Sequence, residues 1–86
     1  MLSELIRLNE IELIGIIGML LILIAYGLNQ THKWSQDDFK YDFTNFLGGA
    51  LLFVYAFSLG SIPFLILQAV WALVSLRDCF KDMKLI

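Results

Sequence analysis

The sequence predicts an all-α membrane protein whose three transmembrane helices form a single domain over residues 1–86. Hydrophobic residues make up 59% of the chain and charged residues only 16%, and the mean hydropathy is +0.78. A soluble domain of this size buries only about 60% of its surface on folding, and soluble domains carry about 25% charged residues. The chain has too much apolar surface for such a domain, so the lipid bilayer is its predicted surrounding.

Three apolar runs, at residues 13–28, 43–59 and 62–76, carry this hydrophobicity. None of them alternates as a barrel strand would, and lipid offers no partner to a free backbone amide, so helices are predicted. Each run is slightly shorter than the roughly 20 residues that cross the hydrocarbon core. Flanking residues extend the predicted helices to about 11–29, 36–59 and 62–80.

The first helix is expected to begin after Asn9, which can cap it, with Glu12 three residues later. Met1–Asn9 either lies along the membrane surface or frays. The alternative for this helix is a signal peptide cleaved near Ala25–Gly27. Met1–Glu12 contains three acids and one base, which is the wrong balance for a signal peptide.

Ser35 and Asp38 resemble a capping box, which predicts that the second helix begins near Gln36. The carboxylates of Asp37, Asp38 and Asp42 then stabilise the positive end of its dipole.

Gly60 suits the position after the second helix, and Pro63 suits the first turn of the third. The two residues predict a tight antiparallel hairpin.

The lysines and arginines predict the orientation in the membrane. Three spans place Arg7 alone on one side, and place on the other Lys33, Lys40, Arg77, Lys81 and Lys84. This excess predicts a cytoplasmic C-terminus and an N-terminus outside, in a cytoplasmic (inner) membrane.

Small and polar residues recur on one face of each helix, and we expect these three faces to converge because they allow close packing away from lipid. The predicted packing residues are Gly15, Gly18, Gly48, Gly49 and Ala72, and the candidate interior polar or solute-facing residues are Tyr26, Asn45, Gln68, Trp71 and Ser75. An amide in hydrocarbon needs a partner, and the candidates for Gln68 are Asn45, Tyr26 or Gln68 of a second copy. The polar set either joins helices or lines a cavity that holds a solute.

Other function classes find no support in the sequence. A net charge of −2 without a basic block argues against nucleic acid as a partner. The single cysteine, Cys79, cannot form an internal disulfide, and His32 is expected to be a solvated loop residue. We expect no metal, no cofactor and no enzyme activity, because there is no His/Cys cluster and no nucleophile–base pair.

Several motifs resemble a family of small bacterial membrane proteins of unknown function. They are Ala25-Tyr26, Thr31, Trp34-Ser35, Asp37, Asp38, Tyr41, Asn45–Ala50 and Pro63–Leu76 with Val70–Leu73 inside it. That family is similar to the SemiSWEETs, which are three-helix half-transporters of the PQ-loop group.

The resemblance implies a SemiSWEET-like triple-helix bundle that dimerises and holds a sugar near the membrane midplane. The asparagine of the SemiSWEETs falls on Gln68, and their tryptophan falls on Leu52. Three hypotheses follow: a homo-oligomeric bundle of unassigned role, a dimeric half-transporter for a small polar solute such as a sugar, and an accessory subunit of a larger membrane complex. A transporter requires a second copy, because three helices cannot enclose a path.

Overall fold

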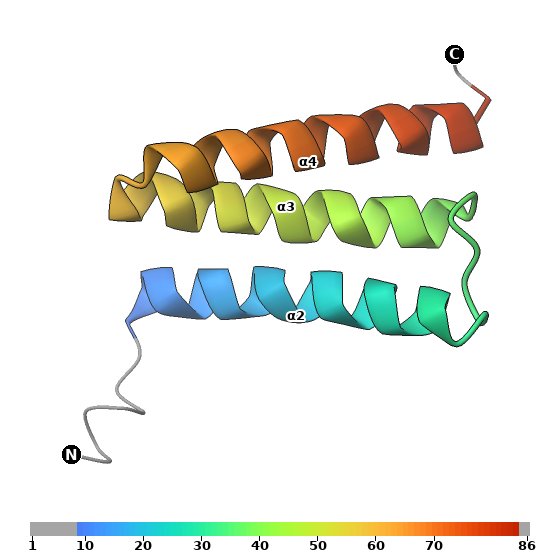
Figure 1. Cartoon of the computed structure of the whole chain (residues 1–86), viewed down its shortest axis with the longest axis horizontal. Helices are drawn as coiled ribbons and strands as arrows, with labels where there is room; N and C mark the ends of the chain where they lie inside the picture. The colour runs from blue at the N-terminus through green and yellow to red at the C-terminus, as the bar shows by residue number, and fades with distance from the viewer. Residues whose placement is uncertain (1–8, 85–86) are drawn as a thin grey trace.

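The computed structural model describes residues 9–84 and contains three helices joined by two connections (Figure 1). They are α2 (Glu10–Gln30), α3 (Phe39–Leu59) and α4 (Ile62–Asp82). The prediction of three helices is confirmed, with bounds close to those expected. The predicted surface segment before Asn9 lies outside the described residues.

Each of the three helices is long and apolar enough to cross a membrane. A helix of 21 residues is about 31 Å long at about 1.5 Å per residue, which matches a hydrocarbon core of about 30 Å. Large apolar side chains cover the outside of the molecule, and among residues 9–84 no large side chain is fully buried. A structure without an apolar core is suited to lipid, where helices associate through close backbone packing.

The predicted signals at the helix ends are largely confirmed. The backbone N–H of Glu12 donates to Oδ1 of Asn9 over 2.7 Å, so Asn9 caps α2. Gly60 ends α3 in the left-handed region at φ 70°, where a side chain would be strained. Pro63 lies in the first turn of α4, where its missing N–H costs no hydrogen bond.

The predicted start of the second helix near Gln36 is wrong, because α3 begins at Phe39 with Asp38 as its N-terminal cap residue. Half of the predicted capping pair does form, since the N–H of Ser35 donates to Asp38 over 2.9 Å. The hydroxyl of Ser35, however, accepts from the N–H of Asp37 and therefore caps a turn rather than the helix.

The three helices lie side by side with α3 in the middle, as Figure 1 shows. α3 packs against both neighbours, whereas no Cα atom of α2 lies within 8 Å of a Cα atom of α4. The expectation that the three small-residue faces converge is therefore wrong. The arrangement leaves an open trough whose floor is α3.

Two neighbouring glycines allow α3 to approach both helices closely. A Cβ added to Gly48 would lie 2.8 Å from the carbonyl oxygen of Gly18, and one added to Gly18 would lie 2.8 Å from that of Gly48. On the other side, a Cβ on Gly49 would meet Trp71 at 3.1 Å and Ala72 at 3.4 Å. The sequence correctly identified these packing residues, but Gly48 faces α2 and Gly49 faces α4.

Gly15 makes room for an aromatic ring rather than for a helix backbone. A Cβ at this position would lie 2.7 Å from the ring of Tyr55 on α3. The ring thus fills the space beside α2 near the end of the molecule at which α2 begins.

Candidate functional site

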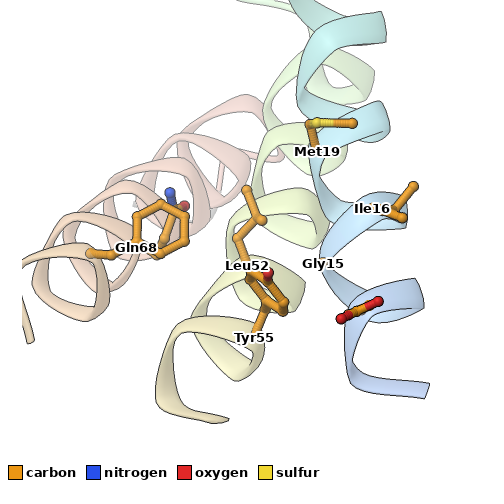
Figure 2. A pocket seen from close by; sticks show the side chains of 8 residues that line it. Gly15, Ile16, Met19, Leu52, Tyr55 and Gln68 are labelled. Carbon is orange, nitrogen blue, oxygen red and sulfur yellow. The ribbon is translucent and has the colours of Figure 1, made fainter. Parts of the chain in front are cut away.

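The open side of the trough forms a groove between α2 and α4, which we call the α2–α4 groove. It consists of two adjoining hollows of about 450 and 320 Å³ that share Met19, Leu52 and Gln68. Figure 2 shows the first hollow, with Gly15, Ile16 and Met19 on one side, Leu52 and Tyr55 on the floor, and Gln68 on the other side. The remaining lining residues are Glu12, Ile22, Leu23, Phe64, Leu67 and Trp71.

Gln68 is the polar group at the centre of this apolar groove. Its side chain is only 7% exposed, and its Oε1 atom is buried without a hydrogen-bond partner among residues 9–84. An unpaired buried acceptor costs about 1–3 kcal/mol, and lipid cannot supply a donor. Among the described residues, Gln68 therefore has an unmet hydrogen bond in the α2–α4 groove.

The structure brings Gln68 together with two of the residues that the sequence connected with it. Leu52, which the motifs predicted at the position of the SemiSWEET tryptophan, lines both hollows with Gln68. Trp71 lines the second hollow and is 43% exposed, so its ring is open to a molecule in the groove. These three side chains form a small site with one amide and one indole on an apolar floor.

Neither intrachain partner predicted for Gln68 is correct. Asn45 is buried in α3, but its Nδ2 donates to the carbonyl oxygen of Tyr41 over 3.0 Å, within its own helix. Tyr26 is 57% exposed and lies outside the groove, so its prediction as an interior residue is wrong. Ser75 is buried on α4 as predicted, but it lies beyond the groove lining.

The sequence analysis missed a second polar site, at the end of the molecule where α3 begins and α4 ends. Asp42 is buried there, and it lines a hollow with Asp82. A signal was available, because Asp42 lies three residues before Asn45 on the small and polar face of α3. Asp82 likewise continues the face of α4 that carries Ser75 and Cys79, both of which are buried.

The residues available for metal binding or catalysis are few. Within residues 9–84, no group of three or more His, Cys, Asp or Glu side chains is arranged to hold a metal ion. His32 lies in the connection between α2 and α3 at φ 63°, and Cys79 is a buried free thiol. Near His32, the ammonium of Lys40 lies 5.8 Å from the centre of the Trp34 ring, a cation–π contact that helps to order the connection.

Comparison with known proteins identifies a family without naming a function. A family model matches residues 11–83, and the chain belongs to that family, which is uncharacterised. No curated protein and no solved structure matches the chain. The similarity to SemiSWEETs thus stays a prediction from the motifs alone.

Proposed function

We propose that this member of an uncharacterised family is a homodimeric protein of the cytoplasmic membrane, with two copies paired groove to groove. The observation that carries the proposal is the buried Oε1 atom of Gln68, which has no partner within residues 9–84 and belongs to a groove that α2 and α4 leave open. A second copy would cover the groove and supply the missing donor. As the positive charges indicate, the N-terminus would lie outside and the C-terminus in the cytoplasm.

A second copy suits Gln68 because a primary amide is self-complementary. Each amide offers a donor at nitrogen and an acceptor at oxygen, so two amides related by a two-fold axis can form two equivalent hydrogen bonds. The terminal torsion of a glutamine is soft, so the amide can turn its oxygen toward the groove when a donor arrives. The apolar lining on both sides then packs against its own copy.

Passage of a small polar solute between the two copies is the second candidate function. It is favoured by the meeting of Gln68, Leu52 and Trp71 in one groove, where the amide can hydrogen-bond a hydroxyl group and the indole can stack on a sugar ring. The larger hollow, at about 450 Å³, is within the range of roughly 300–1,000 Å³ typical of small-molecule sites. The dimer would then be a half-transporter pair, and we propose no enzymatic activity for it.

Cysteine crosslinking in native membranes tests the pairing. Cys79 is first replaced by serine, and a single cysteine is then introduced at Leu67 or at Leu73. Both residues are exposed leucines of α4, but Leu67 lines the α2–α4 groove, whereas Leu73 lines a different hollow, between α3 and α4. We expect a disulfide-linked dimer with Leu67→Cys and none with Leu73→Cys.

The other outcomes are equally informative. Crosslinking at Leu73 alone would mean that the copies meet through the other face. Crosslinking at neither position, with a monomer in mild detergent and in liposomes, would refute the homodimer and favour an accessory subunit with a different partner. Uptake of glucose into liposomes, abolished by Gln68→Leu, would support solute passage; no uptake by a crosslinkable dimer would refute it for this sugar.

A further inference from the structure

A separate polar hollow, distant from the α2–α4 groove, lies where α3 begins and α4 ends. It has a volume of about 260 Å³, and its lining is dominated by the carboxyl groups of Asp37, Asp42, Asp78 and Asp82, with Lys81 as the one cationic group. Unlike the groove, it lies at one end of the spanning helices, outside their apolar runs at residues 43–59 and 62–76, so water at the membrane surface can reach it. This polar hollow lies between α3 and α4, whose other ends are joined by the hairpin at Gly60.

Two of these carboxyl groups, on different helices, lie against each other. The side chain of Asp42 on α3 is only 4% exposed. It lies within hydrogen-bonding reach of the side chain of Asp82 on α4. The Oδ2 atom of Asp82 is itself buried and has no hydrogen-bond partner within residues 9–84.

This arrangement is unfavourable when both carboxyl groups are ionised. Each is only an acceptor of hydrogen bonds, and two like charges at short range in a buried site strongly oppose simultaneous ionisation. One proton removes both problems, because a protonated carboxyl group donates to the neighbouring carboxylate in a short, charge-assisted bond.

We infer that Asp42 and Asp82 form a proton-binding site, in which one proton shared by the two carboxyl groups ties α3 to α4. The proton comes from the water at this end of the molecule, and its uptake changes the charge of the pair from −2 to −1. The O–H of one carboxyl group then donates to an oxygen of the other. The inference is independent of the proposed dimer, since both residues belong to the same chain.

The charged groups around the pair favour proton uptake. Asp78 on α4 and Asp37 in the connection before α3 both act on Asp42 as like charges. Asp78 is bound to Arg77 over 3.1 Å, which reduces but does not remove its effect. The other ionisable side chains at this end are the phenol of Tyr41, which lines the hollow, and the thiol of Cys79, which lies close to the carboxyl groups on α4.

Lys81 offers the competing explanation, namely that its ammonium group neutralises the carboxylates. It lines the same hollow, but within residues 9–84 it forms no ion pair with Asp42 or Asp82. The two explanations differ in the sign of the pH dependence. A shared proton makes the native state bind more protons than the unfolded state, so stability is present at low pH and lost as pH rises. An ion pair with Lys81 stabilises carboxylates and is lost as pH falls.

The test is the unfolding equilibrium of the full chain in mixed detergent micelles from pH 5 to pH 9. For a single linked proton, the unfolding constant should rise up to about tenfold per pH unit within the titration range. Asp42→Asn and Asp82→Asn should each flatten this rise, because the neutral amide donates to the remaining carboxylate at every pH. Asp78→Asn, a matched change on α4, should keep it.

Infrared spectroscopy gives a readout that does not depend on unfolding. The wild type should show the carbonyl stretch of a protonated carboxyl group that disappears as pH rises, and this band should be absent from Asp42→Asn and Asp82→Asn. Stability that falls toward low pH, or a wild-type band that persists in both asparagine variants, would overturn the inference.

Discussion

Replacement of Gln68 by leucine should have opposite effects on the stability of the monomer and on the stability of the dimer. Within residues 9–84 of one copy, the Oε1 atom of Gln68 is buried without a partner, which costs about 1–3 kcal/mol. Leucine fills a similar volume without a polar atom, so the variant monomer should be more stable than the wild type. In a dimer that pairs the two amides, the same change removes both hydrogen bonds.

The expected weakening of the dimer follows from the number of bonds. A hydrogen bond between membrane helices contributes about 0.6 kcal/mol on average and about 1.7 kcal/mol at most. Two equivalent bonds contribute about 1.2–3.4 kcal/mol, which corresponds to a rise in the dimer dissociation constant of roughly 8-fold to 300-fold. Gln68→Leu should therefore dimerise less while unfolding at a higher temperature as a monomer.

The dissociation constant of the dimer is measured in liposomes, by energy transfer between donor- and acceptor-labelled chains as the ratio of lipid to protein increases. Thermal unfolding at high dilution in detergent gives the monomer stability. Ser75→Ala is the control, because Ser75 is also buried on α4 but lies outside the groove lining. An unchanged dissociation constant in Gln68→Leu would refute the pairing of the amides, and a less stable monomer would show that the oxygen already has a partner.

Two further predictions concern the packing of α3. Gly18→Ala should destabilise the protein by about 1–3 kcal/mol, because the new Cβ would lie 2.8 Å from the backbone oxygen of Gly48. The control is Gly27→Ala on the same helix, whose Cβ would meet nothing within 4 Å and which should stabilise the protein by about 0.5–1 kcal/mol. Thermal unfolding of both variants measures the difference, and equal effects would contradict the close approach of α2 and α3. Asn45→Ala should lose about 1 kcal/mol of stability, from the bond to Tyr41, and leave the dimer dissociation constant unchanged, so a weakened dimer would place Asn45 in the interface.

The features that the sequence predicted correctly depend on neighbours along the chain. A cap such as Asn9, a turn such as Gly60 and the length of an apolar run are all determined within a few residues. The start of α3 was predicted less well because Ser35 and Asp38 can close either a turn or a helix, and in the structure their side chains close the turn before α3 without capping the helix. Local patterns therefore gave the number of helices and most of their ends.

The arrangement of the helices relative to one another could not be predicted from local sequence patterns. Gly48 and Gly49 are adjacent, so a sequence pattern assigns both to one face, yet the structure directs them to different neighbours. This division makes α3 the middle helix and keeps α2 away from α4, which in turn leaves Gln68 without the partners expected for it. The burial of Asp42 was missed because a carboxylate in the first turn of a helix is usually explained by its interaction with the helix dipole.

The connections also determine which helix is freest to change the width of the groove. α3 and α4 are joined by the short turn at Gly60 and, at their other ends, by the approach of Asp82 to the buried Asp42. α2 is held to α3 by the close approach of Gly18 to Gly48 and is linked to it by the longer connection at residues 31–38. Since no Cα atom of α2 lies within 8 Å of a Cα atom of α4, a movement of α2 about its glycine contact would widen or narrow the groove without disturbing the α3–α4 hairpin.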